Sequence, residues 1–187
     1  IELNELSTNH TLEYSTDSIE WHNMLKATSI TLKNNGDKVY LRGYLSDNNS
    51  TEDYTNFEMT GKIAASGNCN ALWNKNNLNL NAPLKKYCGY KLFADCKSLT
   101  TAPDLPATTL EEHCYDSMFY NCTSLTTAPD LPATTLASSC YRTMFSYCKS
   151  LTEAPELPAK ILSSNCYNHM FSGCSKLTTT PELPATT

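Results

Sequence analysis

The stretch SLTTAPDLPATTL at residues 124–136, together with CYRTMFSYC at residues 140–148, decides the fold because both recur along the chain. The leucine that leads the first stretch returns every 26 residues, as Leu99, Leu125, Leu151 and Leu177. A fixed period of this length is typical of a solenoid, in which each unit exposes an apolar face that only the next unit can cover. We therefore expect a repeat array over the second half of the chain.

Apolar residue types occupy equivalent positions in successive repeats. The resulting columns are Cys88, Cys114, Cys140 and Cys166; Cys96, Cys122, Cys148 and Cys174; Leu92, Met118, Met144 and Met170; Phe93, Phe119, Phe145 and Phe171; and Leu84, Leu110, Leu136 and Leu162. Within one repeat, Cys114, Met118 and Cys122 follow i, i+4, i+8 spacing, which predicts a short helix with one buried face. The following Leu-Thr-Thr segment is β-prone, and Pro129 ends it early. Each repeat is thus predicted to hold a short strand and a helical turn or two.

Residues 1–66 have a different pattern. Short alternating runs at residues 12–14, 19–21, 30–32, 39–44 and 57–63 are separated by turn-forming clusters. Their spacing predicts a small antiparallel β-domain that resembles a sandwich. Residues 67–83 are then expected to form a connector and the N-terminal cap of the solenoid, and residues 84–187 the repeat array.

The repeats resemble a known family. The segment M-F-x-x-C-x-S-L-T at Met118–Thr126 is similar to the A-F-x-x-C-x-x-L signature of BspA-like leucine-rich repeats, as is the Leu-Pro-Ala-Thr-Thr-Leu linker at residues 131–136. The resemblance covers about residues 84–187. It implies a right-handed α/β leucine-rich-repeat solenoid, preceded by a β-sandwich module, in a bacterial surface or secreted protein that binds host proteins or other cells. The predicted fold class is therefore α+β, in two parts.

Composition excludes some classes of function. The net charge is −5 and no Lys/Arg cluster is present, which argues against a nucleic-acid partner. The sequence contains no run of 18 apolar residues, the length that could span a membrane. We expect an extracellular or cell-surface protein whose signal or lipid anchor is missing from this sequence. The final E-L-P-A-T-T stops partway through a repeat, so either the array continues or something else covers its open end.

Nine cysteines raise the question of metal sites and disulfides. Cys114 and Cys122 are too far apart in sequence for a structural zinc pair, and the histidines at 10, 22, 113 and 169 form no matching set, so no metal site is predicted. Bridges between neighbours in a column are possible by distance, but parallel side chains favour free thiols. Whether column cysteines form disulfides is left open, and Cys69 lies outside both columns.

Catalysis finds no support in the sequence. His113 adjoins Cys114, yet adjacent residues on a helix point in different directions. No nucleophile elbow or phosphate-binding glycine loop is present, so we expect neither an enzyme nor a cofactor. One column is acidic and could attract Ca²⁺, although a solvated row is favoured: Asp104, Asp130, Glu156 and Glu182.

Recognition is the favoured function, and its ligand-binding residues are unknown. Two columns vary between repeats and could read a partner: Lys97, Thr123, Lys149 and Ser175, and Thr101, Thr127, Glu153 and Thr179. A tyrosine column, Tyr115, Tyr141 and Tyr167, could stack on a ligand, but packing between repeats is favoured. We expect a non-catalytic adhesion protein with a protein or glycan ligand. The alternatives are a structural spacer or stalk, and carbohydrate capture by the β-domain through Trp21, Tyr40, Tyr44 or Tyr54.

Overall fold

A computed structural model describes residues 1–5, 10–45, 50–73 and 83–184. The regular elements are short: β1 (Glu2–Glu5), β2 (Glu13–Ser15), β3 (His22–Asn23), β4 (Tyr40–Arg42), β5 (Asn56–Glu58), β6 (Ile63–Ala64), the 3₁₀ helix η1 (Cys69–Trp73), β7 (Leu99–Thr101), β8 (Thr109–Leu110) and β9 (Thr135–Leu136). Residues 74–82 of the predicted connector lie outside the described part of the chain.

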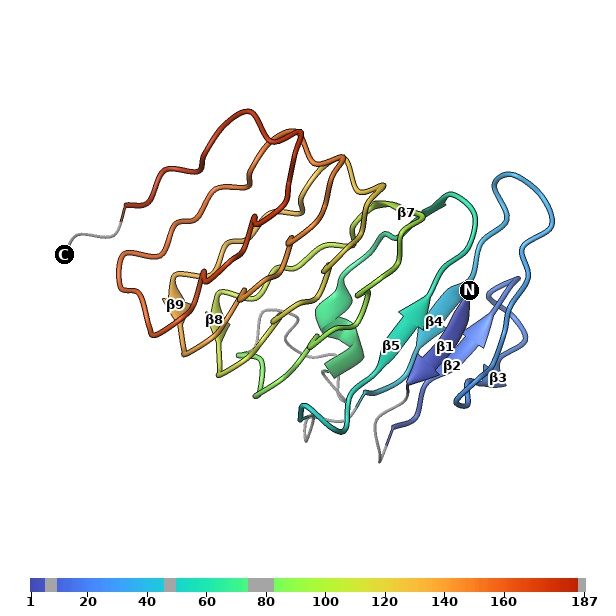
Figure 1. Ribbon diagram of the computed structural model, residues 1–187. Helices are drawn as coiled ribbons and strands as arrows, with labels where there is room; N and C mark the ends of the chain where they lie inside the picture. The colour runs from blue at the N-terminus through green and yellow to red at the C-terminus, as the bar shows by residue number, and fades with distance from the viewer. Residues whose placement is uncertain (6–9, 46–49, 74–82, 185–187) are drawn as a thin grey trace.

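The predicted fold class is wrong. The described residues contain no α-helix, so the chain is not a right-handed α/β leucine-rich-repeat solenoid. The N-terminal strands form one antiparallel sheet of two strands, β1–β5, and one of three strands, β3–β2–β4, which do not close into a sandwich. The remaining sheets are two-stranded and parallel, β6–β7 and β8–β9. Irregular backbone and tandem turns make up most of the molecule (Figure 1).

Tandem turns replace the helix that the i, i+4, i+8 spacing predicted. Every second amide in residues 114–122 bonds three residues back, as from Met118 N–H to the Tyr115 carbonyl at 3.2 Å. The backbone at His113, Tyr115 and Ser117 has φ between 58° and 59°, which no α-helix contains. In the last repeat, buried or half-buried pairs alternate with exposed pairs in a four-residue period. Over two turns, a repeat of four residues is hard to distinguish from the 3.6-residue period of a helix, which explains why the helix prediction was wrong.

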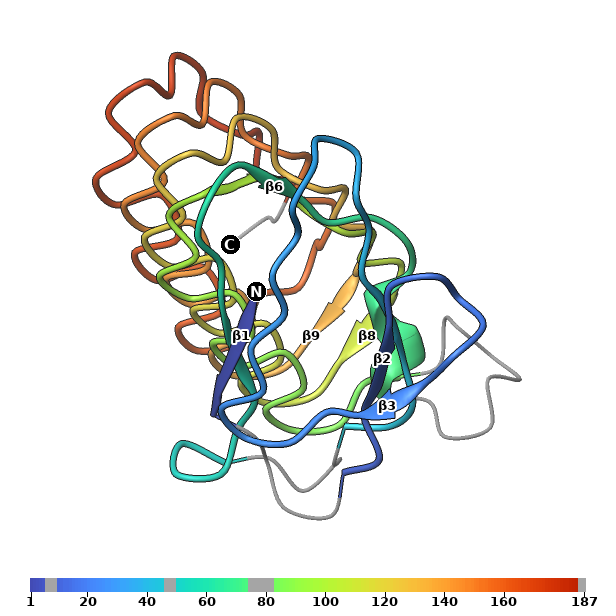
Figure 2. The same ribbon diagram turned by 90° about the vertical axis from the view of Figure 1, so that its right-hand side faces the viewer.

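The amides that do not close turns join one repeat to the next. At each of three junctions the same four positions donate to carbonyls of the following repeat; at the second junction these donors are His113, Ser117, Phe119 and Asn121. Isolated parallel bridges continue the ladder elsewhere, including Leu84 with Leu110 and Thr101 with Thr127. Successive 26-residue repeats therefore stack in register, as Figure 2 shows.

The core consists of side chains that stack from repeat to repeat. The rings of Phe93, Phe119 and Phe145 lie nearly parallel, with centroids 5.6 and 5.7 Å apart. Met118 and Met144 beside them are fully buried. Burial of these columns supplies the stabilisation that the short strands alone cannot, because apolar burial contributes about 25 cal/mol per Å².

The N-terminal part contributes one more layer to this stack. Phe57 N–H donates to the Leu92 carbonyl at 2.9 Å, and its ring lies 5.7 Å from that of Phe93. Further along, β6 pairs in parallel with β7, with Ile63 opposite Leu99. Residues 57–69 thus cover the first repeat although they do not share its sequence. The division of the chain near residues 66 and 84 remains a prediction.

Candidate functional site

An open cleft of about 630 Å³ lies where β5 meets the first two repeats. One wall comes from the N-terminal part of the chain and carries Tyr54 and Asn56. The other wall comes from the repeats and carries Lys91, Lys97 and Tyr120. These two segments lie side by side because residues 57–69, which directly follow Asn56, cover the first repeat.

Aromatic rings and an ammonium group meet on one side of the cleft. The Lys91 Nζ atom lies 5.5 Å from the centre of the Tyr54 ring and 5.3 Å from that of Tyr90. The two tyrosines pack edge to face, with centroids 5.3 Å apart. An ammonium over aromatic faces is attracted by the ring quadrupole, which fixes these three side chains relative to one another.

Side-chain amides hold the segments around the cleft together. The Asn56 side-chain amide donates to the carbonyls of Lys91 and Ala94 at 2.7 and 3.1 Å, which ties β5 to the first repeat. The Asn121 amide donates to the Asp95 carboxylate at 2.7 Å across neighbouring repeats. The cleft therefore offers ring faces, cations and a carboxylate on a hydrogen-bonded frame. This mixture can stack on a flat apolar face and hydrogen-bond its polar rim.

A buried carboxylate connects neighbouring repeats. Asp116 has no exposed surface, and its Oδ2 atom lies 2.8 Å from His113 Nδ1 and accepts from Arg142 Nε at 2.9 Å. The Ser117 hydroxyl donates to its other oxygen at 2.8 Å. His113 also stacks on the Tyr87 ring at 4.7 Å. Because a buried charge needs partners, Asp116 ties its own repeat to the next through Arg142, and His113 connects this pair to the preceding repeat through Tyr87.

His113 and Cys114 engage different partners. The imidazole of His113 bonds Asp116, whereas the Cys114 thiol donates to the Lys85 carbonyl at 2.8 Å. The Ser117 hydroxyl bonds the Asp116 carboxylate and not the His113 imidazole. In a hydrolytic triad the serine bonds the histidine and the histidine bonds the carboxylate, so these three residues are not arranged as a triad.

All nine cysteines are free thiols in the structure. Thiols of both columns donate to a carbonyl of the preceding layer, as from Cys122 to Phe93 at 3.0 Å and from Cys140 to Glu111 at 3.0 Å. Burial raises the pKa of Cys140 to about 11 and that of Cys148 to about 12. Such thiols stay protonated and act as small apolar side chains with a weak donor.

The tyrosine column packs between repeats. Tyr115 and Tyr141 are buried, and their rings stack at 5.9 Å, as do those of Tyr141 and Tyr167 at 6.0 Å. The Tyr115 hydroxyl donates to the Asn70 side chain of η1 at 2.7 Å. Burial raises the pKa of both Tyr115 and Tyr141 well above the ordinary value. The rings of Tyr115 and Tyr141 therefore offer no face to a ligand, whereas Tyr167 is half-buried.

The N-terminal aromatic candidates differ in their exposure and in their contacts. Tyr40 is exposed, whereas Trp21, Tyr44 and Tyr54 are half-buried. The Arg42 guanidinium stacks on the Trp21 ring at 3.9 Å and occupies that face. Of the four candidates, Tyr54 alone is among the residues described as lining the cleft.

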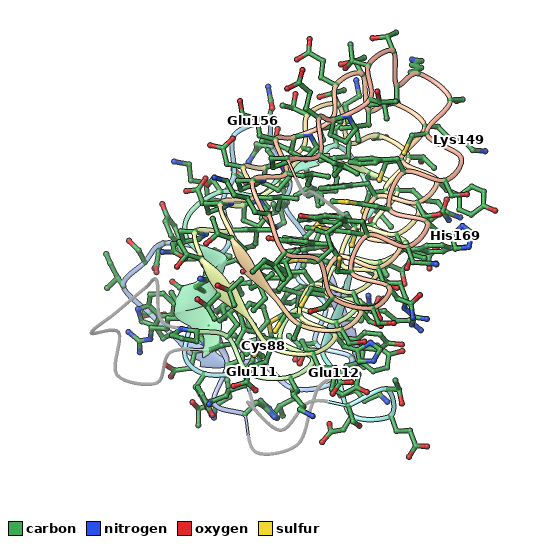
Figure 3. The ribbon with its side chains drawn as sticks, turned by 90° about the vertical axis from the view of Figure 1, so that its left-hand side faces the viewer. Cys88, Glu111, Glu112, Lys149, Glu156 and His169 are labelled. Carbon is green, nitrogen blue, oxygen red and sulfur yellow. The ribbon has the colours of Figure 1, made fainter. Side chains whose placement is uncertain are left out.

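The variable columns are accessible, and one of them reaches the cleft. Thr101, Thr127, Glu153 and Thr179 are exposed, as are Lys97, Lys149 and Ser175. Figure 3 shows Lys149 and His169 on one side of the stack, and Glu156 of the acidic column on another. The acidic column is exposed throughout, and the described residues hold no group of three or more side chains suited to a metal ion.

Sequence reasoning missed Asn56, Lys91 and Tyr120. Lys91 has Ser117, Thr143 and His169 as its column equivalents, so the change of residue type between repeats was a usable signal. Asn56 gave no such signal, because it lies outside the repeats and has no column equivalents to compare with.

The chain matches no protein-family model, no curated protein and no solved structure. In the part of the chain that the structure describes, we also find no helix with the length and hydropathy of a membrane span.

Proposed function

We propose that the chain is a non-catalytic binding protein of the bacterial surface or secreted fraction, and that it holds a protein or glycan ligand through its repeats. The cleft between β5 and the first two repeats is the centre of the binding surface. The resemblance to BspA-like repeats supports the class and the location. The cleft supports the choice of surface.

One observation carries the proposal: Tyr54 and Tyr120 line the same cleft as Lys91, Lys97 and Asp95. Tyrosine gives a large, rigid contact area together with a polar tip, which is why it is enriched where proteins bind partners. Lysine and carboxylate groups beside it add hydrogen bonds that orient a ligand. The hydrogen-bonded frame keeps this arrangement in place before binding, which lowers the entropic cost of association.

Glycan and protein arrays probed with the labelled chain test the proposal. We expect saturable binding to at least one ligand class. Substitutions Tyr54→Ala and Lys97→Ala should each weaken that binding about tenfold, which corresponds to about 1.4 kcal/mol.

Two variants serve as matched controls. Tyr40→Ala removes an exposed tyrosine on β4 that is not among the described lining residues, and Lys149→Ala removes an exposed lysine two repeats along the column of Lys97. Both should bind as the parent chain does. Equal losses in the control variants would remove the cleft as the binding surface. No saturable ligand across broad arrays would favour the spacer.

A further inference from the structure

A pair of tyrosines extends from the cleft to the following repeat. Tyr120 lines the cleft, and its ring packs edge to face with that of Tyr147, with centroids 5.7 Å apart. Tyr147 is 44% exposed and Tyr120 is half-buried. An edge-to-face contact covers one face of only one of the two rings, which leaves the other faces of this pair outside the contact.

The rings at both ends of this row are held in place. A Cβ atom on Gly173 would lie 2.7 Å from Tyr147 Cδ1, so the Tyr147 ring lies directly against the backbone of the next repeat. At the other end, the Lys91 ammonium lies 5.5 Å from the centre of the Tyr54 ring. Rings that are fixed before a ligand arrives lose little freedom when it binds.

The charges in the cleft are balanced. Its described lining residues include two lysines, Lys91 and Lys97, and two carboxylates, Glu58 and Asp95. An anionic ligand would meet the carboxylates and a cationic ligand the ammonium groups, and contact between like charges is unfavourable. A hydroxyl group both donates and accepts, so it can bond a carboxylate and an ammonium group at once. The cleft therefore favours a neutral ligand with many hydroxyl groups.

The backbone of β5 beside the cleft is already paired on both sides. One side pairs with β1, with Phe57 opposite Leu3. On the other side, Phe57 N–H donates to the Leu92 carbonyl, and the Phe57 carbonyl accepts from the Cys96 thiol at 2.9 Å. A peptide cannot be added to β5 as a further strand, although strand addition is a common mode of peptide recognition. These contacts favour a ligand that binds through side chains.

We propose that the cleft binds a neutral glycan of several sugar units, whose chain continues from Tyr54 and Tyr120 onto Tyr147. This assignment rests on the proposed function and narrows its ligand to one class. The apolar face of a pyranose ring packs on the tyrosines, and hydroxyl groups at its rim bond Lys97 and Asp95. Because successive sugars repeat the same faces, one chain engages the cleft and Tyr147 together, and affinity grows with chain length.

Calorimetric titration of the whole chain with defined oligosaccharides tests the proposal. The neutral probes are cellohexaose, chitohexaose, maltohexaose, laminarihexaose and mannohexaose, and the acidic probes are hexagalacturonate and a heparin hexasaccharide. We expect at least one neutral probe to bind about tenfold or more tightly than either acidic probe. Its affinity should change less than about twofold between about 50 and about 500 mM NaCl, because salt screens only interactions between charges.

Variants test the path of the chain. Tyr147→Ala should weaken the bound hexasaccharide about fivefold, yet leave the trisaccharide of the same sugar unchanged, since the shorter chain stays within the cleft. Tyr54→Ala should weaken both. Tyr40→Ala removes an exposed tyrosine of β4 that is not among the described lining residues, and it should weaken neither. NMR titration measures the trisaccharide.

The outcomes separate this inference from the proposed function. No binding of any neutral probe at millimolar concentration, tighter binding of an acidic probe, or an equal effect of Tyr147→Ala on both chain lengths would each overturn the neutral glycan chain. If an acidic glycan or a protein then bound in a manner that depends on Tyr54, the cleft would keep its role. Saturable binding that Tyr54→Ala left unchanged would overturn the cleft as well.

Discussion

Gly89 occupies a position where two constraints coincide. Its φ is 75°, and a Cβ atom there would lie 2.7 Å from Cδ1 of the buried Tyr115 ring. Tyr115 cannot move aside easily, because it stacks on Tyr141 and bonds Asn70. Glycine at this residue leaves the space that the Tyr115 ring fills, and its φ is one that other residue types adopt only with strain.

Gly89→Ala is therefore expected to lower the free energy of unfolding by roughly 3 kcal/mol, as the sum of left-handed backbone strain and overpacking. Gly36→Ala is the matched control, since its φ is 93° and no atom lies within 4 Å of the added Cβ. It should lose only about 1 kcal/mol. Denaturant unfolding of both variants measures the difference, and equal losses would show that the Tyr115 ring yields.

The buried carboxylate of Asp116 supports a second prediction at this scale. Asp116→Asn keeps the shape of the side chain but removes the charge that His113, Arg142 and Ser117 share. We expect a loss of roughly 2 kcal/mol, because a buried donor is left poorly paired. Asp104→Asn, at an exposed carboxylate, should change stability by less than about 0.5 kcal/mol. Thermal unfolding at neutral pH compares the two variants, and a loss at Asp116 no larger than that at Asp104 would contradict this role.

At the scale of the element, the tandem turns of each repeat show which structural features can be predicted from the sequence. The repeat period and the columns can be read from the sequence because identical side chains pack against one another at every junction, as Phe93, Phe119 and Phe145 do. The backbone between the columns cannot be read in this way. Residues such as Tyr115 and Ser117 adopt left-handed φ although their types do not favour it, since inter-repeat hydrogen bonds outweigh local preference.

The phenylalanine column predicts a graded response along the stack. Phe119 is fully buried between Phe93 and Phe145, whereas Phe171 is half-buried at the last repeat and contacts the ring of Phe145 alone in the described column. Phe119→Leu should cost about 1.5 kcal/mol through lost ring contacts. Phe171→Leu should cost less than half as much. Chemical denaturation of the two variants tests the gradient, and a larger loss at Phe171 would contradict it.

At the scale of the whole molecule, one continuous core runs from the N-terminal strands to the last repeat, with Leu12, Met24 and Leu45 buried at one end and Met170 at the other. The sequence predicts which residues fill this core in the repeats. It does not predict the cleft, because the cleft depends on Asn56 and Phe57 meeting the first repeat without sharing its sequence. Among the residues that line the cleft, the sequence offered only Tyr54 and Lys97 as candidates. Tyr54 was a candidate for carbohydrate capture, and Lys97 belonged to a variable column of the repeats.

The many buried thiols make the stability of the whole molecule sensitive to alkaline pH. Burial raises the pKa of Cys96 and of Cys148 to about 12, and it raises the pKa of Cys114 and Cys122 well above the ordinary value. In the unfolded chain these thiols ionise near pH 8.5. Above that pH the unfolded state binds fewer protons than the folded state, so the free energy of unfolding falls as pH rises.

Each such thiol contributes a slope of up to about 1.4 kcal/mol per pH unit, from about pH 8.5 until the folded pKa is reached. Because several thiols act together, we expect Tm to be nearly constant from pH 6 to 8 and to fall steeply above pH 9. Cys148→Ala removes one of these protons and should make the decline shallower at pH 9 to 11, even though it lowers Tm at pH 7. Calorimetry of both proteins across this range, under reducing conditions, measures the two slopes. A Tm that stayed level to pH 10.5, or equal slopes for the two proteins, would mean that the thiol columns are not held protonated by the fold.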